Sequence, residues 1–216
     1  MAIAITWPNL VTVVRMLLVF AVVIMAYGHT MWVRLLAAFL AVLTVVGDWL
    51  DGYLARKLHQ STTIGSILDL AADRIIENVL WILLASLQLI PIWIPIVVVS
   101  RGILTDGIRN YALSYGHWGF GERSIHESPL GKFLTGSPIM RTGYALVKAF
   151  SFGWLLLWWA FSGSGSTILG IKASANGAVF KVGYWAAVVA AIICVVRGIP
   201  VLVEGIGLIQ RANPDG

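Results

Sequence analysis

The sequence predicts an all-α integral membrane protein, a bundle of about six transmembrane helices, and three observations support this. Hydrophobic residues make up 59% of the 216 residues and charged residues only 12%, whereas soluble domains carry about 25% charged residues. The mean hydropathy is +0.87. The apolar residues form long runs separated by polar connections. Together these features exclude a water-soluble globule and an intrinsically disordered chain.

Six apolar runs are each long enough to cross a bilayer, which takes about 20 residues in a helix. They cover approximately residues 9–27, 31–54, 65–90, 92–115, 137–161 and 178–209. We expect all six to belong to a single membrane domain that comprises residues 1–216.

Turn signals justify the boundaries of the first three runs. The first run ends at the polar Gly28-His29-Thr30, and the second ends in the basic and polar stretch 56–61. Pro91 closes the third run, because proline lacks the backbone donor that a continuing helix needs.

The last three runs are bounded in the same way. Pro91 and Pro95 mark a very short turn into the fourth run, and a long polar connection over 116–132 precedes the fifth. The sequence Ser-Gly-Ser-Gly-Ser at 162–166 has loop composition and precedes the sixth.

Basic residues are distributed unevenly among these connections. The connections after the second and fourth runs and the C-terminal tail hold Arg56, Lys57, Arg123, Lys132 and Arg211. The opposite connections hold Lys172, with Arg34 just inside the second run. Because positively charged loops stay in the cytoplasm, we expect both termini there, in a multi-pass protein of the cell membrane. The net charge of +5 then indicates anionic lipids or substrates, and no nucleic acid partner is expected.

Four aspartates are concentrated where the second run ends and the third begins: Asp48, Asp51, Asp69 and Asp73. On a helix, residues three or four apart share a face. The short connection makes the two helices antiparallel neighbours, so all four carboxylates can converge at the cytoplasmic end of the bundle. This end of helices 2 and 3 is the predicted active site.

Such a cluster needs compensating positive charge, because each aspartate near the hydrocarbon costs about 2.5–3.5 kcal/mol and like charges repel. Arg56 and Arg74 can offset two charges, but an all-oxygen donor set is better suited to two divalent ions, Mg²⁺ or Mn²⁺. A paired-metal site is typical of displacement at phosphorus. Buried ion pairs between the helices and a divalent-cation transporter remain the alternatives.

The segment from Asp48 to Asp73 fits the pattern D-x-x-D-G-x-x-A-R-x8-G-x-x-x-D-x-x-x-D without a gap. In this it resembles the CDP-alcohol phosphatidyltransferases. The resemblance covers roughly residues 5–150, and the other motifs are most similar to those of the bacterial phosphatidylglycerolphosphate synthases within that family. One of these is the opening Pro8-Asn9-Leu-Val-Thr12-Val-Val-Arg15.

The resemblance implies a role for each matching residue. Asp48, Asp51 and Asp69 would hold two metal ions, and Asp73 would assist them and act as the general base. The residues implied to contact the CDP-lipid are Asn9, Thr12, Gly52, Ala55, Arg56, Thr62 and Gly65. A homodimer is expected on the same ground.

The acceptor side departs from the synthase pattern at two places. Gly102 stands where these synthases usually carry Glu, and the element beginning Gly131-Lys132 lacks a second Lys. A phosphorylated acceptor such as sn-glycerol 3-phosphate needs cations, and the candidates are Arg101, Arg109, Lys132 and Arg141. The expected reaction is phosphatidyl transfer from CDP-diacylglycerol to glycerol 3-phosphate, and a cardiolipin-synthase-like reaction is the runner-up.

Overall fold

The computed structural model describes residues 7–57, 63–114, 128, 131–162, 167–168, 171–172 and 177–212. The six predicted runs all form α-helices: α1 (Trp7–Ala26), α2 (Met31–Lys57), α3 (Thr63–Ser86), α4 (Trp93–Ser114), α6 (Pro138–Ser162) and α7 (Ala178–Ala212). The described residues are almost entirely helical, so the all-α prediction is confirmed. Two features were not predicted. One is a π-helical turn, η1 (Lys132–Gly136), and the other is an antiparallel pair of two-residue strands, β1 (Thr167–Ile168) and β2 (Ile171–Lys172).

The chain divides into two compact units. Unit 1 comprises Met1–Ile92 and Ala149–Trp185, and unit 2 comprises Trp93–Lys148 and Ala186–Gly216. Unit 1 therefore contains α1, α2, α3 and the strand pair, and unit 2 contains α4 and η1. Helices α6 and α7 each contribute residues to both units. The expectation of a single domain stays a prediction.

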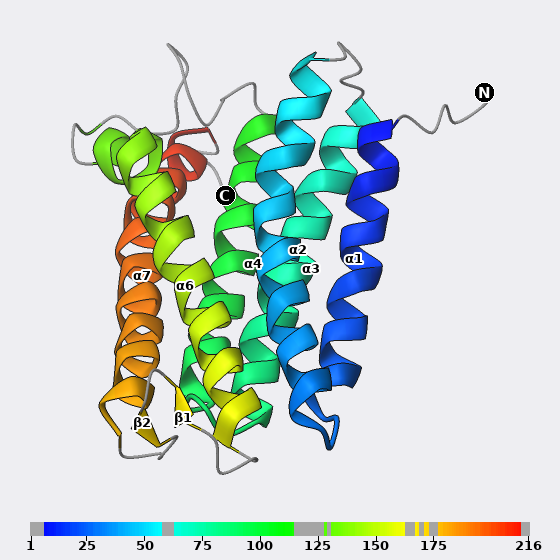
Figure 1. Cartoon of the computed structure of the whole chain (residues 1–216). Helices are drawn as coiled ribbons and strands as arrows, with labels where there is room; N and C mark the ends of the chain where they lie inside the picture. Colours follow the sequence, from blue (N-terminus) through cyan, green and yellow to red (C-terminus); the bar gives the residue numbers. More distant parts are fainter. Residues whose placement is uncertain are drawn as a thin grey trace. The chain divides into compact units, whose positions relative to one another are not determined.

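In unit 1, α1 packs against α2 and α3, and α2 also contacts α3. Figure 1 shows that the start of α1, the end of α2 and the start of α3 lie at the same end of this three-helix group. The core is built from large apolar side chains, among them Trp81 and Phe152, which are fully buried. Their rings meet edge to face at 4.7 Å, a favoured aromatic geometry.

The turn between α1 and α2 is held by side chains at the opposite end of unit 1. The Trp159 indole donates a hydrogen bond to the carbonyl of Ala26 at 2.8 Å, and Arg34 Nε donates one to the carbonyl of Gly28 at 2.8 Å. The Arg34 guanidinium also lies 4.6 Å from the centre of the Trp159 ring, a cation–π contact. Trp159 thus satisfies a carbonyl that the end of α1 leaves unpaired, and Arg34 satisfies one in the turn that follows.

Helix α3 ends in a Schellman motif. Gln88 adopts a left-handed conformation with φ of 58°, its N–H donates to Ala85 O, and the N–H of Leu89 donates to Leu84 O, both at 2.9 Å. Leu84 and Leu89 are both buried, which supplies the hydrophobic contact that usually accompanies this motif. The third run therefore stops as a helix before the Pro91 that the sequence used as its boundary.

Within the described residues, three helices are long and apolar enough to cross a membrane: Asn9–Ala26 in α1, Pro138–Ser162 in α6 and Ala178–Gly207 in α7. Helix α2 adds a shorter apolar stretch, Met31–Gly47. The protein is therefore an integral membrane protein, while the prediction of about six spans is supported for three. Helices α3 and α4 have sufficient length, but the former carries Asp69, Asp73, Arg74 and Glu77, and the latter Arg101, Asp106 and Arg109.

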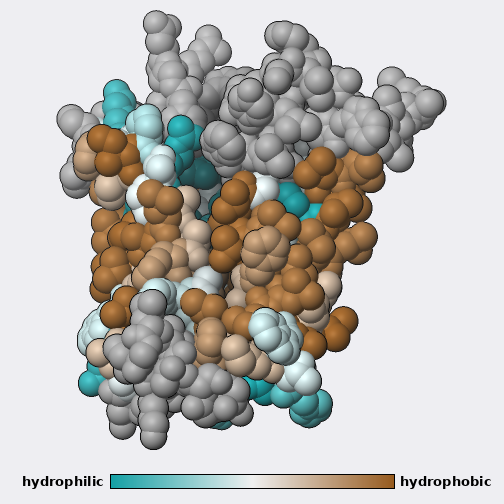
Figure 2. Space-filling model, viewed as in Figure 1, coloured by the Kyte–Doolittle hydropathy of each residue, from teal (hydrophilic) through white to brown (hydrophobic). Residues whose placement is uncertain are grey.

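The exposed face of α1 is apolar. Leu17 is 64% exposed and Ile24 is 75% exposed, and Leu10, Val13, Val14 and Phe20 continue the same stripe. Figure 2 shows this hydrophobic surface, with hydrophilic residues at the turn that follows α1. Such a stripe is unfavourable in water and favourable against lipid tails.

Candidate active site

The aspartate motif falls on two helix ends, as predicted. The backbone of α2 carries Asp48 and Asp51 in its last turns, and the first turns of α3 carry Asp69 and Asp73. Helix α2 also includes Gly52, Ala55 and Arg56. The side chains of residues 48–57 and the whole of Thr62 lie outside the described part of the chain. The convergence of all four carboxylates therefore stays a prediction.

Asp69 and Asp73 lie one turn apart on α3 and face the same cation. Arg15 Nη2 donates a hydrogen bond to Asp73 Oδ1 at 3.2 Å, and Arg15 Nη1 lies 3.8 Å from Asp69 Oδ1. The first contact is a charge-assisted hydrogen bond and the second is an ion pair beyond hydrogen-bond distance. The side chains of Asp69 and Asp73 are 41% and 40% exposed. Both carboxylates thus remain accessible to a ligand.

Arg15 is held in place by α2. It is buried, with only 4% of its surface exposed, and its Nε donates a hydrogen bond to the carbonyl of Thr44 at 3.0 Å. Its stem lies against Gly47, where an added Cβ would be 3.0 Å from Arg15 Cδ and 3.1 Å from Nε. Glycine at position 47 therefore makes room for the arginine. One guanidinium group joins α1, α2 and α3.

Sequence reasoning missed Arg15 as the partner of these aspartates. It considered Arg56 and Arg74 as partial compensation for the charge and favoured two divalent ions, whereas Arg74 forms an ion pair of 3.9 Å with Glu77 on the same helix. A signal was present: Arg15 is the sole ionisable residue in the sequence of α1, and a charge within an apolar span usually has a partner and a function.

The other predicted lipid-contacting residues of unit 1 lie at the same end. Asn9 and Thr12 are on the first turns of α1, and Gly65 is on the first turn of α3. Figure 1 shows both helix starts beside the end of α2. Thr12 is buried, with 3% of its surface exposed, and lies one turn before Arg15. The residues are thus grouped, while their contact with a lipid stays a prediction.

The described donors are compatible with hard divalent ions. Asp69 and Asp73 offer carboxylate oxygens, which Mg²⁺ and Mn²⁺ prefer, and both are partly exposed. Among the residues whose side chains are described, no group of three or more His, Cys, Asp or Glu lies close enough to hold a metal ion. The predicted set also needs Asp48 and Asp51.

In unit 2, two of the predicted acceptor-binding residues gather around a third arginine. Arg101 on α4 and Arg141 on α6 both lie close enough to repel Arg197 of α7 electrostatically. The Arg101 side chain lies against Gly198, where an added Cβ would be 2.9 Å from Arg101 Nε. The Arg197 guanidinium is 5.3 Å from the centre of the Tyr144 ring. We call Arg101, Arg141 and Arg197 the arginine cluster.

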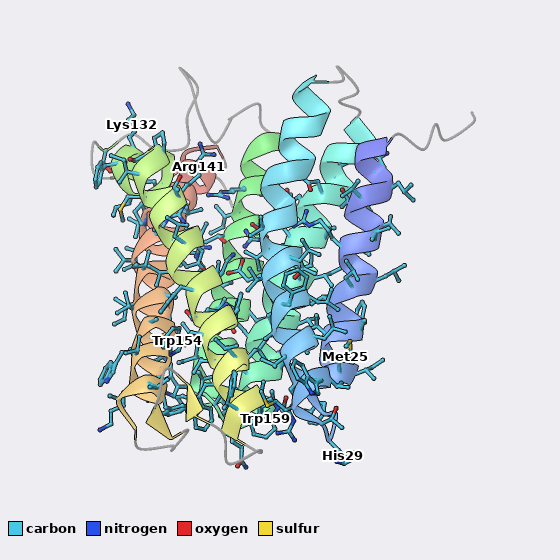
Figure 3. All side chains as sticks on the ribbon, in the orientation of Figure 1. Met25, His29, Lys132, Arg141, Trp154 and Trp159 are labelled. Atoms are coloured by element: carbon cyan, nitrogen blue, oxygen red, sulfur yellow. The ribbon has the colours of Figure 1, made fainter. Side chains whose placement is uncertain are left out.

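The remaining two predicted residues lie on the same elements. Arg109 follows Arg101 by two turns on α4 and is half-buried. Lys132 begins η1 and is exposed, and Figure 3 shows Lys132 and Arg141 near the same end of unit 2. That all four belong to one pocket stays a prediction. Arg197 was not predicted, because it lies in the last apolar run, beyond the motifs that the sequence offered.

The π-helical turn that carries Lys132 is fixed by two charged residues of α7. Glu204 Oε1 accepts hydrogen bonds from the backbone N–H of Ser128, at 3.3 Å, and from the Ser128 hydroxyl. The same Ser128 hydroxyl accepts the N–H of Gly131 at 3.0 Å. Arg197 Nε donates to the carbonyl of Leu134 at 3.1 Å. The turn is therefore held just before its first residue and at its middle residue.

Comparison with known proteins identifies the family. The family model described as CDP-alcohol phosphatidyltransferase matches residues 5–165, which is most of the chain and includes Arg15 and the whole aspartate motif. The chain belongs to the CDP-alcohol phosphatidyltransferase family. It is therefore a phosphatidyltransferase enzyme, and this confirms the family resemblance read from the motif. Arg197 and Glu204 lie outside the matched residues.

Similar curated proteins carry the name CDP-diacylglycerol–glycerol-3-phosphate 3-phosphatidyltransferase. The protein of Pseudomonas fluorescens is 34% identical over 112 residues, which is 50% of this chain and 57% of that protein. The protein of Bacillus subtilis is 30% identical over 170 residues, or 70% of this chain and 85% of that protein. The Escherichia coli protein is 27% identical over 142 residues, which is 64% of this chain and 75% of that protein.

Proposed function

We propose that this phosphatidyltransferase transfers the phosphatidyl group of CDP-diacylglycerol to sn-glycerol 3-phosphate, releasing CMP and forming phosphatidylglycerol phosphate. The observation that supports this most is the gap-free aspartate motif on the end of α2 and the start of α3. The names of the similar proteins favour glycerol 3-phosphate as the acceptor. The alternative of a divalent-cation transporter is not favoured, because the chain belongs to a family of phosphatidyltransferases.

Four aspartates would hold two divalent ions, Mg²⁺ or Mn²⁺: Asp48, Asp51, Asp69 and Asp73. When bound, the ions would supply positive charge to the pyrophosphate and to the departing CMP. Asn9, Thr12, Gly52, Ala55, Arg56, Thr62 and Gly65 would contact the CDP-lipid. The small residues among them leave room for a phosphate to approach the backbone, and Arg56 would pair with phosphate oxygens.

Asp73 would act as the general base. It would accept the proton of the acceptor hydroxyl, whose oxygen attacks the β-phosphorus in line. A new oxygen–phosphorus bond forms as the bond from that phosphorus to the bridging oxygen breaks, and the electron pair leaves with CMP. The partial exposure of Asp73 is consistent with access of a soluble acceptor.

Cations of unit 2 would bind the phosphate of the acceptor. In the arginine cluster, Arg197 is repelled by both Arg101 and Arg141, so a doubly charged phosphate bound there would relieve that repulsion. Arg109 and Lys132 are the further candidates. The names of the relatives favour glycerol 3-phosphate, whereas Gly102 in place of Glu leaves phosphatidylglycerol, as in a cardiolipin-synthase-like reaction, the second candidate.

The membrane arrangement proposed with this function has about six spans, one domain and both termini in the cytoplasm. The active site would face the cytoplasm, from which CMP can leave and glycerol 3-phosphate can enter, while the acyl chains of the substrate stay in the lipid. A homodimer is proposed by analogy with the family.

The function is tested by measuring CMP release from CDP-diacylglycerol by purified protein with Mg²⁺ and a panel of acceptors. We expect release with glycerol 3-phosphate and none after chelation with EDTA. Asp69→Asn should abolish release from protein that still assembles in the membrane. Release with phosphatidylglycerol in place of glycerol 3-phosphate would favour the second candidate, and full activity in EDTA would end the two-metal proposal.

A further inference from the structure

We propose that Arg15 is a positioning residue of the phosphatidyl-transfer site: it orients Asp73 and Asp69 and serves as a resident positive charge beside them. The inference rests on the proposed function, because it concerns the same aspartates. It adds a residue of α1 to a site whose motif lies on α2 and α3.

The first step is that the Arg15 guanidinium cannot move freely. It is buried, its Nε is tied to the Thr44 carbonyl at 3.0 Å, and its stem lies in the space left by Gly47. Arginine stays protonated in proteins and presents its donors in a rigid plane. Fixing Nε therefore fixes the direction of both Nη atoms.

The second step is that both Nη atoms point to α3. Nη2 contacts Asp73 Oδ1 at 3.2 Å and Nη1 lies 3.8 Å from Asp69 Oδ1. Each aspartate is approached through one oxygen, and about two fifths of each side chain remains exposed. The arginine thus orients both carboxylates without covering them. When a fixed partner holds a reacting group in the right orientation, the catalysed reaction is faster.

The third step concerns charge. The fixed cation offsets part of the repulsion between Asp69 and Asp73, and it also opposes any divalent cation that the same carboxylates bind. Two effects with opposite signs follow. Removing the charge should strengthen Mg²⁺ binding, whereas removing the orientation should slow turnover. A residue that only stabilises the fold would weaken both together.

The experiment compares wild type with Arg15→Met and Arg15→Lys by two measurements. The first is the Mg²⁺ concentration that gives half of the full rise in thermal unfolding temperature, which reports binding without turnover. The second is kcat for CMP release. For Arg15→Met we expect the Mg²⁺ midpoint to fall at least about fivefold and kcat to fall at least about tenfold. Arg15→Lys keeps the charge, so its midpoint should match wild type while kcat falls.

Arg34→Met is the matched control. Arg34 also donates its Nε to a backbone carbonyl and packs in unit 1, but it lies at the other end of α2. We expect it to lower the unfolding temperature and to leave the Mg²⁺ midpoint and kcat unchanged. If Arg15→Met gives this same pattern, or if it weakens Mg²⁺ binding and lowers kcat together, the proposal is overturned.

Two further outcomes keep the test decisive. If wild type releases no CMP, the proposed function fails, whereas normal release by both wild type and Arg15→Met overturns the role of Arg15 alone. If Arg15→Met does not assemble, Gly47→Ala displaces the arginine stem and keeps its charge. That variant should lower kcat at an unchanged Mg²⁺ midpoint, and wild-type kcat would overturn the proposal.

Discussion

Asp73 carries the sharpest prediction at the scale of single residues. Asp73→Asn keeps the shape of the side chain and its contact with Arg15 but removes its ability to accept a proton. We expect kcat for CMP release to fall by about 10²–10⁴-fold, as for a lost general base. The Michaelis constant for CDP-diacylglycerol should change much less, and steady-state kinetics measures both.

Glu77→Gln is the control for this change. Glu77 follows Asp73 by one turn on α3 and pairs with Arg74, and no catalytic role is assigned to it. It should keep kcat within about threefold of wild type, since Glu77 neither accepts nor donates the transferred proton in the proposed reaction. Turnover of Asp73→Asn at that same level would refute the general-base assignment.

Arg101→Met tests the acceptor pocket. Loss of one charge-assisted phosphate contact costs about 1.5–3 kcal/mol, so the KM for glycerol 3-phosphate should rise roughly ten- to a hundredfold. The KM for CDP-diacylglycerol should hardly move. Lys181→Met removes an exposed positive charge of α7 in unit 1 and should change neither constant. An unchanged acceptor KM in Arg101→Met would remove this residue from the pocket.

For single residues, the sequence predicted those functional residues whose roles follow from their spacing along the chain. The pattern from Asp48 to Asp73 indicated the family, because helical periodicity relates its members within each helix and the spacing between the two halves fits without a gap. Arg15 and Arg197 were missed, because their partners lie on other helices: Arg15 meets Asp73 only through the packing of α1 on α3. Periodicity assigns a residue to a face of its own helix, and it does not say which helix that face will meet.

Among the elements, helices were predicted well and the irregular turn was not. Apolar runs with clear breakers gave all six α-helices, since length and hydrophobicity are local properties. The π-helical turn η1 has no local signature. Its geometry depends on Glu204 and Arg197, which lie more than sixty residues further along the chain, and such tertiary contacts override propensity.

The Glu204 contact predicts how firmly that turn is held. Glu204→Ala removes the acceptor of the two Ser128 hydrogen bonds, and bonds to a charged group are worth about 1.5–3 kcal/mol. Local opening should therefore increase about tenfold or more. Because Lys132 is exposed, the rate of tryptic cleavage after it in detergent-solubilised protein measures this opening.

Glu204→Gln separates the contact from the charge, because its amide oxygen can still accept both hydrogen bonds. Trypsin should cleave this variant at a rate between those of wild type and Glu204→Ala. Ser128→Ala removes only the hydroxyl and should also accelerate cleavage. Equal rates in Glu204→Ala and wild type would show that the turn is held by other contacts.

For the molecule as a whole, the apolar runs of the sequence and a strict criterion of helix length, hydropathy and charge give different numbers of spans. Three helices satisfy length and hydropathy, whereas the sequence predicted about six spans. Helices α3 and α4 fall short because their ionisable residues lower the hydropathy, and several of these are the proposed functional residues. Charged side chains within a span are tolerated where they face the protein and have partners, as Asp73 and Arg15 do. A hydropathy criterion would therefore miss a span whose charged residues carry function.

Cysteine labelling distinguishes the two topologies. With six spans, the second, third and fourth runs lie between His29 and Lys132. Three is an odd number, so the two residues would be on opposite sides of the membrane. If only α1, α6 and α7 cross, no span lies between them and they share a side. Both side chains are exposed, and Cys194, the single native cysteine, is buried and can be replaced by Ala.

We therefore expect a membrane-impermeant maleimide applied to intact cells to label His29→Cys and to label Lys132→Cys only after the membrane is permeabilised. This follows from the basic connections being retained in the cytoplasm. The parent protein with Cys194→Ala should not react in either state. Equal labelling of both variants in intact cells would contradict the six-span arrangement. Labelling of Lys132→Cys alone would keep six spans and reverse the orientation, which would place the proposed active site outside the cytoplasm, away from the glycerol 3-phosphate that it is proposed to use.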